Sequence, residues 1–371
     1  MDKPVTLYGL PHSLYTGKAR SYLRKQGIPY REVPPSDLVF AREIVPQIGR
    51  GIIPVMVTAK GAVVQDTVEI IDHFERAGKT RHPAYPTDPA LKAVSALVEL
   101  YAVLGLTRHA MHYRWSYLAE QEPFLRDAFG VGGDPERTRA SMERMASYLP
   151  MLGVNADTVP AIEESYRQLL DTLEAHFAQQ PYLLGARPSI GDYALFGPLF
   201  AHLGRDPVPL TIMQQRAPKV FRWVERMHAP DLDTVEYPGS ARNGEFAASV
   251  PDTLGPLLDQ IAAELLPGLT DRLAGLRDFV AETDPQEGEP VVAKPHQRIV
   301  GTADTSFRGV PYRGGVQPYH FLLWQRVQEA AGSDEAAAAL FVRHGLGPVL
   351  DEVLPIRVER ANNIEVWGER A

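Results

Sequence analysis

The fold of this chain is decided by a stretch near its start, in which short apolar runs alternate with polar turns. It reads VTLYGLPHSLYTGKARSYLRK over Val5–Lys25 and GIIPVMVTAKGAVVQDTVEIIDHFER over Gly51–Arg76. Short β-branched runs predict strands, whereas apolar residues repeating every three or four positions predict helices. The stretch therefore predicts an α/β unit with the order strand–helix–strand and then strand–strand–helix.

The element boundaries in this unit follow from local signals. Gly27 and Gly78 fit the left-handed position that closes a helix. The expected strands and helices are Val5–Tyr8, Leu14–Lys25, Tyr30–Val33, a hairpin of Val55–Thr58 with Ala62–Gln65, and Thr67–Arg76. This order of elements is that of a thioredoxin-like domain.

Beyond a proline-rich linker at Arg81–Pro89, the apolar spacing becomes helical. Ser189 and Asp192 form a variant of the capping box at the start of one apolar helix. We expect three parts: a thioredoxin-like domain over residues 1–80, an all-helical domain over 88–232, and a mostly helical extension over 245–371.

Within the extension, Pro267–Gly268 is expected to break a helix that spans residues 252–282. Residues 283–318 are rich in glycine and proline and predict a long loop. Residues 317–331 and 333–343 predict helices, and residues 357–367 predict some extended structure.

Composition excludes several functions. A length of 371 residues indicates two or three domains, and a net charge of −8 argues against nucleic-acid binding as the main role. The chain has no cysteine, which excludes disulfides, thiolate metal sites and a cysteine nucleophile. The N-terminus lacks the apolar core of a signal peptide, and no run reaches about 18 apolar residues. We therefore expect a cytoplasmic protein without a membrane span.

Taken together, these N-terminal motifs resemble the glutathione-binding half of the cytosolic glutathione transferases. By inspection the resemblance covers roughly residues 3–230, and the missing cysteine separates the chain from the cysteine-type classes. It implies a serine- or tyrosine-type enzyme with glutathione as co-substrate, and by analogy a homodimer.

The resemblance places a catalytic hydroxyl at Ser13, which opens the first helix ahead of Lys18 and Arg20. A hydroxyl at a helix N-terminus can stabilise a bound thiolate, because the free amides there carry partial positive charge. Ser13 could instead act only as a helix N-cap. Tyr8 and Tyr15 are the alternative catalytic hydroxyls.

Two further positions of the resemblance lie before the third strand. It implies a cis peptide bond at Ile53–Pro54, which would turn the backbone of Ile53 towards the cysteinyl part of glutathione. Arg50, between two glycines, could reach the glycine carboxylate of glutathione.

The last binding positions lie where the fourth strand meets its helix. The resemblance assigns the α-ammonium of glutathione to Asp66 and its γ-glutamyl carboxylate to Thr67 and the helix N-terminal amides. Gln65 is the alternative if the register shifts by one residue. Asp66 could also be only a helix cap.

Aromatic residues in the helical domain are candidates for a pocket that holds an apolar electrophile, with a packed helix face as the alternative. They are His109, His112, Tyr113 and Trp115. No metal site is expected, since the two histidines lack an obvious third ligand. The aromatic and basic segment 307–320 could form a lid over the cleft or a packed surface loop.

The function implied by the resemblance is conjugation of glutathione to a small hydrophobic electrophile. A glutathione-dependent lyase, isomerase or ether-cleaving enzyme on the same fold is one alternative. A binding or interaction module that kept the fold and lost the chemistry is the other.

Overall fold

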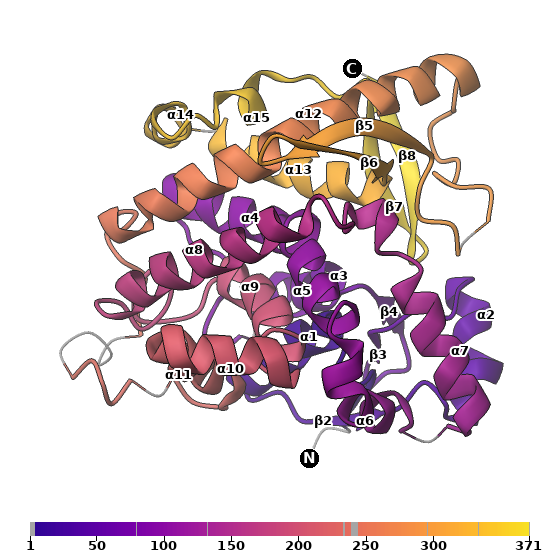
Figure 1. Cartoon of the computed structure of the whole chain (residues 1–371). Coiled ribbons are helices and arrows are strands. Elements are labelled where there is room, and N and C mark those ends of the chain that lie inside the picture. The colour runs from indigo at the N-terminus through magenta and orange to yellow at the C-terminus, as the bar shows by residue number, and fades with distance from the viewer. Residues whose placement is uncertain are drawn as a thin grey trace.

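The N-terminal domain is a four-stranded sheet with helices packed against it, as shown by the computed structural model (Figure 1). The structure describes residues 4–78, 80–131, 133–232, 234–238, 244–294, 296–332 and 334–370. The strand order is β2–β1–β3–β4, with β1 parallel to β2 and antiparallel to β3. The bounds are β1 Val5–Tyr8, α1 Leu14–Lys25, β2 Tyr30–Val33, α2 Val45–Ile48, β3 Val55–Val57, β4 Val63–Gln65 and α3 Thr67–Arg76. The expected thioredoxin-like order is confirmed.

The second part is helical, as expected, and it contains more helices than the apolar spacing indicated. The capping box is present, because the Ser189 hydroxyl accepts from the Asp192 N–H and the Asp192 carboxylate accepts from the Ser189 N–H. Helices α6, α7 and α10 were not anticipated. The bounds are α4 Pro89–Leu104, α5 Leu106–Trp115, α6 Leu118–Phe129, α7 Pro135–Ala146, α8 Val159–Phe177, α9 Ile190–Ala201, α10 Pro207–Arg216 and α11 Pro218–His228.

The extension combines helices with two β-hairpins. Its bounds are α12 Gly255–Thr283, β5 Gly301–Phe307, β6 Val310–Val316, α13 Pro318–Ala331, α14 Glu335–Arg343, α15 Gly347–Asp351, β7 Ile356–Ala361 and β8 Ile364–Arg370. The extended structure expected near the C-terminus is confirmed as β7 and β8. Residue 333, expected to start a helix, lies outside the described residues.

Two expectations for the extension were wrong. Helix α12 continues through Pro267 without a break, because buried Leu265 and Leu269 anchor both sides and Arg272 donates to the carbonyl of Gly268 at 2.6 Å. The expected long loop contains the hairpin β5–β6, which turns through two residues with positive φ, 49° and 80°, at positions 308 and 309. Such a turn matches the twist of paired strands.

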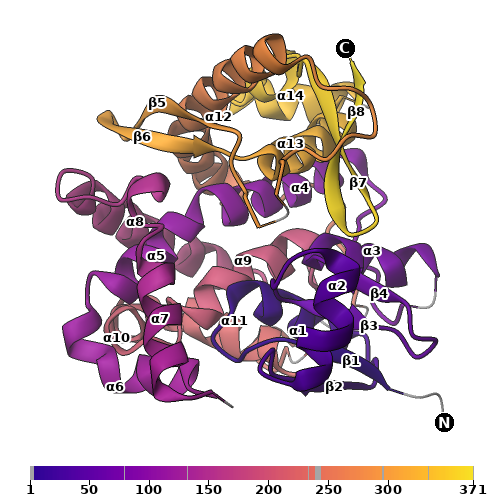
Figure 2. The same ribbon diagram turned by 90° about the vertical axis from the view of Figure 1, so that its right-hand side faces the viewer.

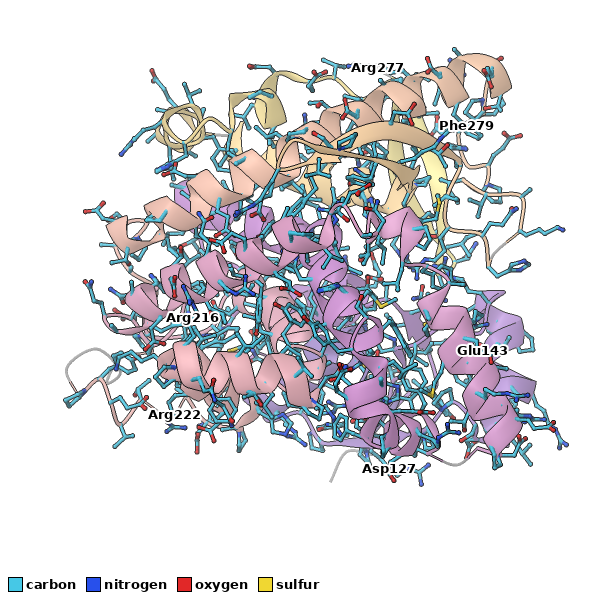
Figure 3. All side chains as sticks on the ribbon, viewed as in Figure 1. Asp127, Glu143, Arg216, Arg222, Arg277 and Phe279 are labelled. Carbon is cyan, nitrogen blue, oxygen red and sulfur yellow. The ribbon has the colours of Figure 1, made fainter. Side chains whose placement is uncertain are left out.

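The extension lies across α4, and its C-terminal hairpin reaches down to the N-terminal domain (Figure 2). Helix α13 packs along α4, and one hydrophobic core runs through all three parts. The stretch Pro89–Trp115 passes a length and composition test for a membrane span, with a mean hydropathy of 1.6, but 78% of the tested window is buried inside the protein. It therefore fits a core helix. Charged side chains such as Glu143, Arg216 and Arg277 lie on the outside (Figure 3).

Candidate functional site

Ser13 caps the start of α1, as one of its two expected roles requires. Its backbone is extended, with φ −83° and ψ 122°, and its hydroxyl accepts from the Thr16 N–H at 3.3 Å. The side chain is half-buried. The hydroxyl proton is still free to be donated to an anion, because this contact uses only a lone pair. Cap and donor roles are therefore compatible at Ser13.

The two alternative tyrosines lie in different surroundings. Tyr8 is buried against Phe40, with ring centroids 5.1 Å apart, and burial raises the pKa of its phenol. Tyr15 is half-buried on the first turn of α1. Burial raises the pKa of Tyr15 as well, although Arg298 and Thr107 act to lower it. Tyr15 thus lies nearer than Tyr8 to the helical domain and the extension.

The basic residues that follow Ser13 are engaged in structural pairs. Lys18 forms a buried ion pair with Glu99 on α4. Arg20 donates two hydrogen bonds of 2.6 Å to the Glu32 carboxylate on β2. These pairs fix α1 against its neighbours and use the charges of both side chains.

The peptide bond Ile53–Pro54 is cis, as expected. Pro54 is buried and Ile53 is half-buried. Among the described residues, no hydrogen-bond partner is found for the backbone N–H or C=O of Ile53. An unpaired N–H and C=O on one residue can receive an extended peptide in the manner of an added strand.

Asp66 and Thr67 form the turn into α3. Asp66 has a φ of 91°, which only a minority of non-glycine residues adopt, and its carboxylate accepts from the Val68 N–H at 2.9 Å. The cap role of Asp66 is thus present. The same carboxylate oxygen also accepts from the Tyr319 hydroxyl of α13 at 2.9 Å. Thr67 is buried at the N-terminus of the helix.

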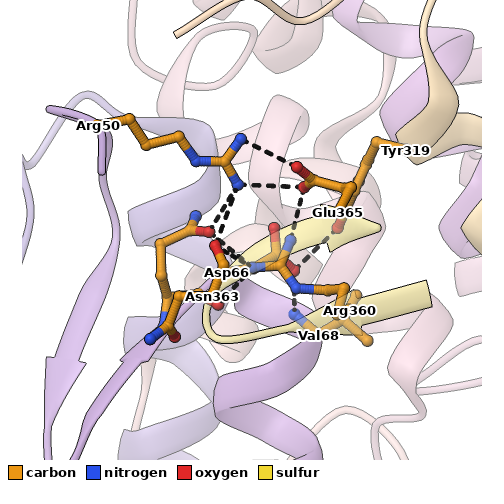
Figure 4. Close-up of polar contacts among 8 residues, drawn as sticks. Arg50, Asp66, Val68, Tyr319, Arg360, Asn363 and Glu365 are labelled. Atoms are coloured by element: carbon orange, nitrogen blue, oxygen red, sulfur yellow. Dashed lines mark hydrogen bonds and ion pairs between the residues drawn. The ribbon is translucent and has the colours of Figure 1, made fainter. Parts of the chain in front are cut away.

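The C-terminal hairpin occupies the space beside these residues (Figure 4). Arg50 donates to both carboxylate oxygens of Glu365, at 3.0 and 3.1 Å, and to the side-chain oxygen of Gln65 at 2.9 Å. Arg360 donates to the same Gln65 oxygen at 2.7 Å and to Glu365 at 2.6 Å. The Gln65 N–H donates to the Asn363 side chain at 2.8 Å.

This cluster is buried and charge-paired. The Arg50 and Glu365 side chains are 6% and 8% exposed. Burial acts to raise the pKa of Glu365, but hydrogen bonding to Arg50 and the charge of Arg360 outweigh it, and the pKa is lowered. Glu365 therefore holds its negative charge, and Arg50 already has a carboxylate partner supplied by its own chain.

The four residues expected to line an electrophile pocket are packed among helices instead. His109 contacts the Ser165 hydroxyl at 2.8 Å, and His112 contacts the Ser116 hydroxyl at 2.9 Å. Tyr113 stacks on a neighbouring tyrosine ring, and Trp115 packs on a phenylalanine ring. All four side chains are buried. Their conformations follow the alternative of a packed helix face.

The segment 307–320 also packs into the body of the protein. Phe307 and Tyr312 are buried, and both rings lie under the Arg108 guanidinium. Arg308 forms an ion pair with Glu264 at 2.6 Å. Most of this segment therefore packs against the body of the protein, whereas Tyr319 near its end reaches Asp66 at the start of α3. In the described part of the chain, no three metal-binding side chains gather into a group that could hold an ion.

Sequence reasoning missed the residues that the extension brings to this site. They are Arg360, Asn363 and Glu365, whereas Tyr319 belongs to the segment 307–320 that the sequence analysis had singled out. The only available signal was the extended character of the last residues. Nothing local connects that segment to Arg50, from which Glu365 is 315 residues distant in sequence.

Comparison with known proteins agrees with this architecture. Residues 7–82 match the model of the glutathione S-transferase N-terminal domain, and residues 156–226 match that of its C-terminal domain. The two matches follow each other in the order that the fold shows. The chain belongs to the glutathione S-transferase superfamily.

Similar members of the superfamily align with about three fifths of this chain. The tetrachloro-p-hydroquinone reductive dehalogenase of Sphingobium chlorophenolicum is 25% identical over 243 residues, 61% of this chain and 92% of that one. The β-etherase LigF of Sphingobium sp. strain SYK-6 is 16% identical, covering 61% and 96%, with a TM-score of 0.43. The glutathione S-transferase CsGST83044 of Ceriporiopsis subvermispora, solved with glutathione, is 16% identical, covering 61% and 99%, with a TM-score of 0.45.

The superfamily models cover the N-terminal domain over residues 7–82 and part of the helical domain over residues 156–226. The extension, which supplies Glu365 and Tyr319 to the site, lies outside both models.

Proposed function

We propose that the protein is a glutathione transferase that binds glutathione in its N-terminal domain and conjugates it to a small apolar electrophile. Membership of the superfamily supports glutathione-dependent enzyme activity in the broad sense. The observation that carries the finer proposal is the placement of the capped helix N-terminus at Ser13 and the unpaired backbone of Ile53 at one edge of the sheet, because β1 ends at Tyr8 opposite Val55, where β3 begins.

Each part of the site has a matching part of the tripeptide. The backbone of Ile53 would hold the cysteinyl residue, and the N-terminus of α3 at Thr67 would hold the γ-glutamyl carboxylate. Bound glutathione supplies the nucleophilic sulfur. The Ser13 hydroxyl would donate to that sulfur and favour its anionic form, which is the reactive one.

Two competing functions have support of their own. The relative at 25% identity is named a reductive dehalogenase, which makes removal of a halogen from an aromatic substrate an alternative reaction. This chain has no cysteine, so no step can use a protein thiol. The buried pairing of Arg50 with Glu365 favours the other alternative, a non-catalytic module whose site is permanently closed.

Titration of glutathione by calorimetry tests the proposal, with S-methylglutathione as a ligand that lacks the ionisable thiol. Saturable 1:1 binding that weakens in Asp66→Ala is expected, because Asp66 caps the α3 N-terminus and the family resemblance assigns the α-ammonium of glutathione to it. A panel of aryl halides, epoxides and aryl ethers, followed by product analysis, then separates conjugation from halide removal and ether cleavage. Absence of binding at millimolar glutathione, both in wild type and in a Glu365→Gln variant, would overturn the proposed transferase activity. The homodimer and the cytoplasmic location remain predictions.

A further inference from the structure

The polar groups around Arg50 form a cluster to which the C-terminus of the chain contributes charges. Arg50 and Arg360 are positive, and Glu365 and Asp66 are negative. One carboxylate, that of Glu365, receives Arg360 at 2.6 Å and Arg50 at 3.0 and 3.1 Å. Planar guanidinium groups that converge on a buried carboxylate make a carboxylate-binding site. The present occupant of that site is a side chain of the same protein.

The hairpin tip also pairs with the exposed edge of the N-terminal sheet. Strand β4 is the edge strand, next to β3 only. The Asn363 side-chain amide accepts from the Gln65 N–H at 2.8 Å and donates to the Val63 carbonyl at 3.3 Å. One carboxamide thus makes the two hydrogen bonds that a peptide group of an added strand would make.

The tip is preformed for this contact. Ala361 and Ile364 are paired across the hairpin, so Asn362 and Asn363 form a two-residue loop, with φ of 50° and 66°. Asparagine tolerates this left-handed conformation better than most residues, and such loops hold a hairpin in one shape. The tip therefore docks as a rigid unit and loses little freedom when it binds.

Little space remains beside the docked tip. The cavity bordered by Arg50, Arg298, Tyr319 and Glu365 has a volume of about 10 Å³. That is room for about one water molecule, whereas small-molecule sites usually measure roughly 300–1,000 Å³. A peptide carboxylate therefore has no room to approach Arg50 through this cavity while Glu365 is docked.

We propose that the tip of the β7–β8 hairpin is an internal ligand that occupies Arg50 and Gln65 and must leave them before a peptide carboxylate can bind there. Glu365 takes the place of the ligand's carboxylate, and Asn363 takes the place of its peptide group. An incoming ligand replaces the Glu365 carboxylate on Arg50 with its own carboxylate, so the charge of Arg50 stays neutralised. The site thereby selects a short peptide with a free carboxylate. That this peptide is glutathione rests on the proposed function.

The test measures S-methylglutathione binding by calorimetry in the full chain, in wild type and three variants. Glu365→Gln removes the competing carboxylate, and Asn363→Ala removes the edge contact while leaving every charge. Glu359→Gln is the matched control, since Glu359 is on the same hairpin and its side chain is 54% exposed. We expect Glu365→Gln to tighten binding roughly tenfold or more and Asn363→Ala about threefold, because apparent affinity scales with the open fraction. Glu359→Gln should match wild type.

Hydrogen exchange of residues 356–370 supplies an independent readout. Saturating S-methylglutathione should speed exchange of these amides in wild type if the tip is displaced. Equal affinity in wild type, Glu365→Gln and Asn363→Ala, or unchanged exchange in the hairpin, overturns this proposal and leaves the glutathione site standing. Tighter binding in Glu365→Gln without turnover of any electrophile supports it and overturns the transferase reading. Absence of binding in all variants overturns both.

Discussion

Replacement of Ser13 separates the two roles that the structure gives it. Its hydroxyl accepts the Thr16 N–H at 3.3 Å, longer than the usual 2.9–3.0 Å or so for an N–H to oxygen bond. Loss of an N-cap costs about 0.5–2 kcal/mol, and a long bond should fall at the low end of that range. A hydrogen bond donated to a thiolate is worth about 1.5–3 kcal/mol. Ser13→Ala should therefore lower turnover roughly ten- to hundredfold and stability by less than about 1 kcal/mol.

The pH dependence of turnover is the decisive assay. Loss of the donor raises the pKa of the bound thiol by about one to two units, so the rate should rise at correspondingly higher pH. Turnover of an aryl halide between about pH 6 and 9 measures this shift. Ser13→Gly is the matched control, because glycine is nearly as good an N-cap as serine but has no hydroxyl. Ser13→Thr should retain both roles.

The result that would refute this reasoning is a Ser13→Gly enzyme with wild-type turnover and an unshifted pH profile. Ser13 would then be a helix cap only, and Tyr15 on the same turn would become the leading candidate. Tyr15→Phe, which removes only the hydroxyl, would be measured next in the same assay.

Three further outcomes are expected from equilibrium unfolding in urea. Lys18→Met should destabilise the protein by about 3–5 kcal/mol, since it leaves the buried Glu99 carboxylate without its ion-pair partner. The double variant Lys18→Met with Glu99→Leu should recover most of this loss. A Lys18→Met variant as stable as wild type would contradict the prediction. Burial lowers the pKa of His109 to about 4, below its unfolded value of about 6.5. Its contribution to the free energy of unfolding is therefore complete above pH 6.5 and is lost as the pH falls towards 4, at about 1.4 kcal/mol per pH unit. His109→Gln should show a shallower dependence of the unfolding free energy on pH in this range, and an equal dependence would refute the assignment. Gly197→Ala places a methyl carbon 2.9 Å from a backbone carbonyl oxygen of α1 and should lower the free energy of unfolding by about 1–3 kcal/mol. Gly301→Ala, with no atom within 4 Å of the new methyl group, should leave stability nearly unchanged. Equal effects of the two substitutions would argue against tight packing between α1 and α9.

The N-terminal domain could be predicted from sequence because its signals are local. Helix α3 begins at Thr67 and ends at Arg76, as predicted, since Asp66 caps one end and Gly78 follows the other with a φ of 63°. The cis bond before Pro54 was also anticipated, through family resemblance rather than through periodicity.

The extension could not be predicted in the same detail, because its composition indicated a loop where tertiary packing forms a β-hairpin. Glycine and proline between residues 283 and 318 favoured a loop, but Phe307, Tyr312 and Val316 give the hairpin β5–β6 a buried face. The interaction of Glu365 with Arg50 depends on how the completed domains pack. The sequence around Arg50 and the sequence around Glu365 contain no pattern that would predict their contact.

Helix α4 gives the extension a second role, which concerns solubility. Twelve of the residues in Pro89–Leu104 are buried in the complete chain, and α13 packs along this helix. A fragment that stops soon after residue 226, where the second superfamily match ends, would leave part of that apolar surface in water. Large exposed apolar patches promote association. We therefore expect a fragment that lacks the extension to associate more readily than the full chain, unless another protein surface covers α4.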